Sequence, residues 1–223
     1  MGGIRLIRTF YMQRHDHWRI VCSDRPGNLL DDEGVARMTA GRKINLRSFE
    51  YRDLAGMVRW NNDGEVEAFV DCDLPKTLPE CELWFQNNVP SRDYRIFAIE
   101  DRAGNLIGDL ELDHISWRNG EAELRIRIGE KDYWNQGYGT DAVRSILRLA
   151  LNELGLRRIY LKVYRFNTRA IRCYEKCGFR RQGVLKRRAK SAGDWKDIIL
   201  MSLHYGFTYA ARESTAASET DKT

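Results

Sequence analysis

The sequence lacks any long hydrophobic run: no apolar stretch approaches the roughly 18 residues that a membrane-spanning helix needs. A secretory signal, with a basic start, an apolar segment and a small-residue cleavage site, is also missing. We therefore predict a cytoplasmic protein with no membrane partner. Of the 223 residues, 43% are hydrophobic and 31% are charged, which is typical of one globular domain with an extension.

Cysteine and histidine are scarce as well. The cysteines are five in number and include no C-x-x-C pair, which favours a reducing compartment over a disulfide framework. Cys173 and Cys177 stand one helical turn apart, but no second ligand pair accompanies them, so we interpret them as packing residues. The four histidines form no metal motif and no partner for a nucleophile. The sequence therefore predicts no metal site.

One part of the chain combines a strand, a loop and a helix. From 121 to 128, apolar and charged residues alternate, which predicts a strand with one buried face. From 142 to 154, apolar residues recur at spacings of three and four, which predicts an amphipathic helix that ends at Gly155. Between them, Gly137 and Gly139 stand where the loop enters the helix. Because glycine allows close backbone approach and a helix start offers unpaired N–H groups, we predict a phosphate cradle there.

A dinucleotide-binding fold is one family that uses such a cradle. Gly137, Gly139 and Ala142 fit its G-x-G-x-x-A fingerprint. That fold also needs a tight strand-to-helix turn and an acidic residue about 20 positions further on. Here a loop of several residues precedes Gly137, and the next strand, 157–163, leads into Arg165 rather than an acid. This interpretation is weak.

Two motifs resemble those of the GNAT superfamily of acyl-CoA N-acyltransferases. Its loop, Gln/Arg-x-x-Gly-x-Gly/Ala, is matched by Gly137 and Gly139, although Trp134 stands where Gln or Arg is usual. That departure is similar to the branch of ribosomal-protein N-terminal acetyltransferases. The second landmark, Asn-x-x-Ala…Tyr…Gly-Phe, is matched by residues 167–179. Both motifs come in the expected order with one strand between them, and the resemblance covers residues 42–205.

The resemblance implies a GNAT fold of the α/β (α+β) class. This fold has a mixed, mostly antiparallel central sheet flanked by helices, with a V-shaped opening between the central strands. Around the domain (42–205), we expect a poorly ordered N-terminal extension (1–41) and a disordered polar tail (206–223). Residue patterns predict further strands at 43–47, 94–100, 106–112 and 194–203, and further helices at 51–61, 79–88 and along the stripe 167–174.

Charge is distributed unevenly along the chain. Residues 156–190 contain thirteen Lys or Arg and one acid. Such a segment can bind nucleic acid, serve the phosphates of coenzyme A or form a solvated surface. No RNA-binding aromatic motif accompanies it, so direct nucleic-acid recognition ranks third. Residues 50–82 contain nine acids and three bases. In the GNAT layout they form the lip on the substrate side, where negative charge favours a cationic amine; an ordinary solvated helix face is the alternative.

Acetyl transfer from a thioester to an amine requires a held cofactor, a neutral amine, a stabilised oxyanion and a protonated leaving thiolate. The resemblance implies that the strand end around Ile126 and Ile128 pairs with the pantetheine arm, and that a free N–H there serves the oxyanion. We predict that the pyrophosphate is held by backbone N–H groups of the loop that comprises Asn135, Gln136, Gly137, Tyr138, Gly139 and Thr140.

Tyr174 is the predicted general acid. It shares one helical stripe with Asn167, Ala170 and Ile171, at spacings of three, four and seven. The resemblance places this stripe beside the cofactor sulfur, with Asn167 as a polar contact or a helix cap. A phenol with a pKa near 10 can donate a proton to a departing thiolate. A tyrosine that packs its ring in the core is the structural alternative.

Glu123 is the predicted base. It lies on the polar face of the 121–128 strand and matches a glutamate often seen there in the ribosomal-protein branch. Either Glu123 or Glu121 could deprotonate an ammonium through a water molecule. An ion pair of Glu123 with Arg125 or Arg157 is the structural alternative.

We therefore predict an N-acetyltransferase that uses acetyl-CoA as co-substrate and transfers the acetyl group directly to a primary amine in a ternary complex. No Cys or Ser stands with a base, so no covalent enzyme intermediate is expected. Three acceptors remain open: a protein N-terminus, a polyamine and an aminoglycoside-like amine. A homodimer is left open. The alternative is a non-catalytic acyl-CoA sensor or ribosome-associated module on the same fold.

Overall fold

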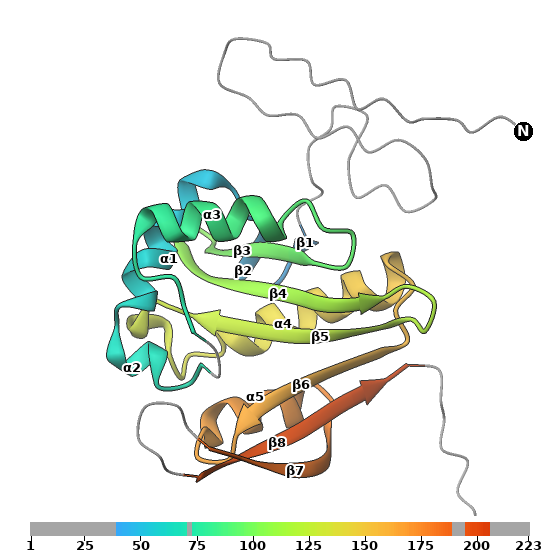
Figure 1. Cartoon of the computed structure of the whole chain (residues 1–223). Helices are drawn as coiled ribbons and strands as arrows, with labels where there is room; N and C mark the ends of the chain where they lie inside the picture. Colours follow the sequence, from blue (N-terminus) through green and yellow to red (C-terminus); the bar gives the residue numbers. More distant parts are fainter. Residues whose placement is uncertain (1–38, 71–72, 189–194, 206–223) are drawn as a thin grey trace, which may run out of the picture. The chain divides into compact units, whose positions relative to one another are not determined.

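The computed structural model describes residues 39–70, 73–188 and 195–205, which form one eight-stranded sheet with flanking helices (Figure 1). Along the sheet the strands follow the order β1-β2-β3-β4-β5-β6-β8-β7. Neighbouring strands are antiparallel except β5 and β6, which run parallel. The predicted fold class is confirmed. The strands are β1 (Thr39–Ala40), β2 (Ile44–Ser48), β3 (Arg95–Asp101), β4 (Leu106–Ser116), β5 (Glu121–Ile128), β6 (Arg158–Tyr164), β7 (Arg180–Arg188) and β8 (Trp195–His204).

Five α-helices accompany the sheet in the described residues: α1 (Leu54–Asn61), α2 (Gly64–Glu67), α3 (Leu78–Asn88), α4 (Tyr138–Arg148) and α5 (Thr168–Lys176). The helices predicted at 51–61 and 79–88 are confirmed as α1, preceded by a 3₁₀ turn, and as α3. Pro79 lies at the start of α3, and Thr77 and Glu80 form a capping box there. The short α2 was not predicted. None of the helices in these residues is long and apolar enough to cross a membrane.

The predicted N-terminal extension and the polar tail fall almost entirely outside the described residues. Only the last part of the extension is described: β1 pairs antiparallel with β2, and Thr39 lies opposite Leu46. The boundaries at residues 42 and 205 stay predictions.

The V-shaped opening lies between β5 and β6. Their parallel pairing covers three positions, from Glu121 opposite Arg158 to Glu123 opposite Tyr160. Beyond these positions β5 continues to Ile128 beside β4, and β6 continues beside β8. The carboxyl-terminal halves of the two strands therefore diverge. In an α/β sheet, such a divergence at the carboxyl ends is where a ligand binds.

The helix after β5 begins earlier than the pattern predicted. Gly137, at the N-cap of α4, has a φ of 86°, in the left-handed region that glycine adopts without steric cost. The apolar face of α4 is buried, and α4 contacts β2 and β5. After Arg148 the helix continues as one π-helical stretch, Leu149–Glu153. Gly155 then adopts a φ of 67° and ends it, as predicted.

Candidate active site

A cavity of about 620 Å³ opens between the diverging strands. Its walls are the ends of β5 and β6, acidic residues of β4, the loop that leads into α4, the first turns of α5 and the segment after α2. The cavity brings together most of the residues predicted from the sequence: Ile126, Ile128, Asn135, Gly137, Gly139, Thr140, Asn167, Tyr174 and Glu123 all line it. Gln136 and Tyr138 belong to the same loop but are not part of the lining.

The loop into α4 is held on two sides. The Lys43 ammonium donates to the Gln136 carbonyl oxygen at 2.8 Å, and the Asp141 carboxylate accepts from the backbone N–H of Lys43 at 2.7 Å. On the other side, the Trp134 indole donates to the Ile128 carbonyl oxygen at 2.7 Å. Trp134, the departure from the usual motif, thus fixes the loop to the end of β5.

This loop fits the phosphate groups of an acyl-CoA. Among the described residues, no side chain caps the start of α4, so its first N–H groups are available to a ligand. Gly137 is exposed, and a Cβ added there would meet no atom within 4 Å. A helix start with unpaired donors and open space before it binds anions. Beyond Glu123, β5 also has no neighbouring strand on its β6 side in the described sheet, which leaves an edge for the pantetheine amides.

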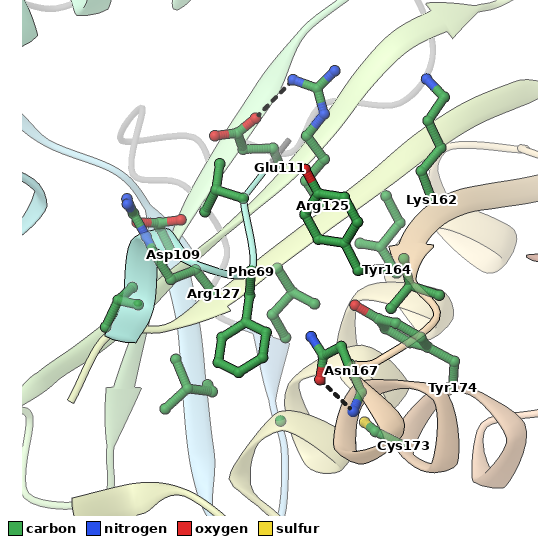
Figure 2. A pocket seen from close by; sticks show the side chains of 18 of the residues that line it. Phe69, Asp109, Glu111, Arg125, Arg127, Lys162, Tyr164, Asn167, Cys173 and Tyr174 are labelled. Carbon is green, nitrogen blue, oxygen red and sulfur yellow. Dashed lines mark hydrogen bonds and ion pairs between the residues drawn. The ribbon is translucent and has the colours of Figure 1, made fainter. Parts of the chain in front are cut away.

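Tyr174 lies in the wall of the cavity on α5. Its side chain is 7% exposed and its ring meets Phe179 edge-on, with 5.8 Å between the ring centroids. Figure 2 shows the hydroxyl directed into the cavity. Burial raises the pKa of Tyr174 well above its ordinary value, so the phenol keeps its proton at neutral pH. Two turns earlier, the Asn167 side chain accepts from the Ala170 N–H at 3.1 Å and caps α5.

Glu123 is buried, in contrast to the polar-face position that the alternation predicted. Only 3% of the residue is exposed. The Lys162 ammonium contacts both carboxylate oxygens, at 3.2 and 3.0 Å, while Arg125 and His114 lie farther away at 3.6 Å. Of the two cations expected as the structural alternative, Arg125 is present at 3.6 Å, but the main cation is Lys162, which was not predicted. Glu121 is ion-paired with Arg158 at 2.8 Å.

Three acids of β4 form a charged wall of the cavity that was not predicted from the sequence. The cross-strand register sets Asp109 opposite Arg127, Glu111 opposite Arg125 and Asp113 opposite Glu123. All of these acids line the cavity. A signal for them existed in the sequence, because acids at alternate positions of one predicted strand must share a face. Which cavity that face borders depends on the tertiary fold.

Glu111 has a strongly perturbed carboxyl. Burial is the main cause, and the charge of Asp109 adds to it, while Arg125 and Arg127 act in the opposite direction; together they raise the pKa of Glu111 to about 7. Burial also raises the pKa of Asp109, although Arg127 donates to its carboxylate. Figure 2 shows Glu111 and Arg125 on one side of the cavity and Tyr174 with Asn167 on the other.

Aromatic side chains surround the cavity between α2 and α5. The Arg169 guanidinium lies 3.8 Å from the ring centroid of Trp134 and 5.4 Å from that of Phe69. Phe69 also contacts Trp134 and Phe166, with centroid distances of 6.1 and 6.0 Å. Phe69, which follows α2, therefore contacts the loop before α4 through Trp134 and the segment before α5 through Phe166.

The two cysteines of α5 pack against α4. Thr140 donates its hydroxyl to the Cys173 sulfur at 3.3 Å, and the Cys177 thiol contacts the Thr140 carbonyl oxygen at 3.7 Å. In the described part of the chain, His, Cys, Asp and Glu side chains form no group of three or more that could hold a metal ion.

Comparison with known proteins agrees with this geometry. The sequence model of a family described as Acetyltransferase (GNAT) domain matches residues 43–180. A spermidine N(1)-acetyltransferase of Vibrio cholerae serotype O1 is 28% identical over 159 residues, which are 71% of this chain and 91% of that protein. The Escherichia coli (strain K12) spermidine N(1)-acetyltransferase is 25% identical over 181 residues, covering 80% and 94%.

Solved structures with a similar fold also include a spermidine N-acetyltransferase. The crystal structure of spermidine N-acetyltransferase from Vibrio cholerae in complex with CoA and spermine superposes with a TM-score of 0.67 at 27% sequence identity. The match covers 73% of this chain and 95% of that one. The specific resemblance to ribosomal-protein N-terminal acetyltransferases stays a prediction. The chain belongs to the GNAT acetyltransferase family, which confirms the predicted enzyme class, an N-acetyltransferase with acetyl-CoA as co-substrate.

Proposed function

We propose that the protein acetylates a small cationic amine of the polyamine type. The observation that carries the proposal is the row of acids along one wall of the cavity. Asp109, Glu111 and Asp113 lie on β4, with Arg125 and Arg127 of β5 beside them, whereas Arg169, Arg172 and Lys176 lie on α5. An acidic wall attracts an ammonium, and a basic wall attracts phosphates. Support also comes from relatives that are named spermidine acetyltransferases and from one related structure that contains spermine.

The two walls suit a ternary complex. The loop 135–140 and the start of α4 hold the pyrophosphate, and the free edge of β5 near Ile126 and Ile128 holds the pantetheine arm. Bound acetyl-CoA supplies the activated acetyl group. A β5 backbone N–H stabilises the negative charge that develops on the acetyl oxygen. Tyr174 donates its proton to the departing thiolate, and the cavity walls hold the amine in line for attack.

The proton of the incoming ammonium needs an acceptor. Glu123, the base predicted from the sequence, and Glu111 are the two candidates. Glu123 is in contact with Lys162, which keeps its carboxylate in place. Its role as base stays a prediction, tested by Glu123→Gln.

The acceptor is tested with purified protein, acetyl-CoA and a panel of amines, with release of free thiol as the readout. Spermidine and spermine should be turned over faster than a peptide with a free N-terminus or an aminoglycoside. Faster turnover of the peptide would replace the polyamine by a protein N-terminus. Tight acetyl-CoA binding without thiol release for any amine would favour the sensor instead.

A further inference from the structure

Glu111 is the acid of the β4 wall with the weakest ionic contact. Asp109 accepts from the Arg127 Nε at 3.0 Å, and Asp113 lies 3.0 Å from Arg125. The nearest cation to Glu111 among the described ion pairs is the same Arg125, at 3.7 Å. Since Arg125 is closer to Asp113, the charge of Glu111 is the least neutralised in a wall that is largely shielded from water. A carboxylate in that position is available to a cationic ligand.

A second feature beside Glu111 points to a ligand. Tyr94, which precedes β3, is 6% exposed and lines the same cavity. Its hydroxyl is buried and makes no well-formed hydrogen bond among the described residues, while the Glu111 carboxylate lies within interaction range of it. Burial, followed by the charge of Glu111, raises the pKa of Tyr94, so the two groups are close enough to interact. A buried hydroxyl with a poorly formed hydrogen bond costs free energy, and an amine nitrogen that contacts both Tyr94 and Glu111 would satisfy it.

The pKa of Glu111 allows its carboxyl to take up and release a proton near neutral pH. The groups that face it are Asp109 and Asp113 on its own strand, Arg125 and Arg127 on β5, and Tyr94 before β3. Burial and Asp109 raise its pKa to about 7, and the two arginines limit the rise. A general base works best when its pKa lies near the working pH.

We propose that Glu111 is the group that removes the proton from the acceptor ammonium, with Tyr94 holding the nitrogen. The inference rests on the proposed amine acetyltransferase function. An N–H bond of the ammonium breaks, its electron pair stays on nitrogen, and the proton forms an O–H bond with Glu111. The neutral amine then attacks the acetyl carbon and forms the C–N bond. As the C–S bond breaks, Tyr174 gives its proton to the leaving thiolate, and the second proton that nitrogen loses when the amide forms returns to Tyr174 through solvent. Glu111 later loses its proton to solvent, and Glu123 remains paired with Lys162 throughout.

The test compares pH profiles of kcat/KM for spermidine. Wild type should show a rising limb with a midpoint near pH 7. Glu111→Gln should lose this limb, and its rate should fall by roughly 10²–10⁴, the usual size of a general-base contribution. Glu111→Asp, which keeps the carboxylate, should retain the limb at a reduced rate. The limb should also persist in Glu123→Gln. Each variant is first checked for its melting temperature and its acetyl-CoA affinity.

A second readout does not depend on turnover. Binding a cation beside Glu111 favours its ionised form, so spermidine binding at pH 7 should release protons. Calorimetry in two buffers of different ionisation enthalpy measures this release, which should occur in wild type and vanish in Glu111→Gln.

The outcomes separate the two claims. If wild type acetylates spermidine but Glu111→Gln keeps both the limb and the proton release, Glu111 is not the base and only this inference is overturned. If the limb disappears in Glu123→Gln instead, Glu123 is the base. If wild type neither binds nor acetylates any amine, the proposed function itself fails.

Discussion

Lys162 and Glu123 form an ion pair, with 3.0 Å between Nζ and Oε2, across the point where β6 and β5 separate. Glu123 is the last residue of β5 that pairs with β6, and Lys162 lies just beyond the last paired residue of β6. The carboxylate side chain is 4% exposed and the ammonium side chain 40%. The pair therefore connects the two walls of the cavity at their junction.

Replacing Lys162 by Met should lower the free energy of unfolding by about 1–3 kcal/mol, because a buried carboxylate loses its main cation. Arg125, at 3.6 Å, limits the loss. Urea denaturation measures it. Lys186→Met, at an exposed position of β7, is the matched control and should change stability by no more than about 0.5 kcal/mol. Equal losses in the two variants would show that the pair does not stabilise the junction.

Gly137→Ala should both destabilise the protein and weaken acetyl-CoA binding. An L-residue at a φ of 86° costs on the order of 1–2 kcal/mol, and relaxation of the loop would turn its N–H groups away. Gly139→Ala is the control. Its φ is not positive and an added Cβ would only touch the Ile128 side chain at 3.7 Å, so stability should be kept. Calorimetry with acetyl-CoA decides, and unchanged affinity in Gly137→Ala would rule out the cradle.

Asp101 should contribute stability that is lost in acid. Its carboxylate accepts from the Asn105 side chain, the N–H groups of Asn105 and Ala103, and the Tyr133 hydroxyl, at 2.8–2.9 Å. The Asn105 side chain contributes most, and together these bonds lower the pKa of Asp101 to about 2. Because the folded pKa lies below the unfolded value of about 3.9, the stabilisation is complete above pH 4 and disappears toward pH 2.

Asp101→Asn should accordingly melt at a lower temperature than wild type at pH 7, and the difference should shrink between pH 4 and pH 2. Thermal unfolding followed by circular dichroism over this range measures it. A constant difference across the range would mean that the charge of Asp101 contributes nothing. Since Asp101 also holds Tyr133, which lines the cavity just before the loop 135–140, the variant should bind acetyl-CoA more weakly as well.

Much of the fold could be predicted from local pattern. The alternation of β5 and the helical spacing of α4 are local patterns that can be seen in the sequence. Gly155 ends the helix because glycine adopts a positive φ, here 67°, without steric cost. The short α2 was missed because four residues show no period, and its one clear signal is the cap at Asp63, whose side chain accepts from Glu65 and Val66. The π-helical end of α4 was not predicted either.

The site was predictable where a motif is continuous in sequence, as in the loop 135–140 and in the stripe from Asn167 to Tyr174. Partners across strands were not predictable. Lys162 meets Glu123 only because β5 and β6 pair parallel over three positions and then diverge. Glu111 was missed because its chemistry comes from burial and from Asp109, Arg125 and Tyr94, which converge only in the folded sheet.

Thiol release from acetyl-CoA in the presence of spermidine, measured for wild type and Tyr174→Phe, tests the central claim most directly. Wild type should release thiol and form acetylated spermidine in equal amounts. Tyr174→Phe keeps the ring packing and should keep acetyl-CoA affinity, while kcat falls by roughly 10²–10⁴. Because the pKa of Tyr174 is raised, the phenol stays protonated, and the wild-type rate should not decline as the pH rises to about 10. Full kcat in Tyr174→Phe, with chemistry rate-limiting, would contradict the assignment of Tyr174 as the acid.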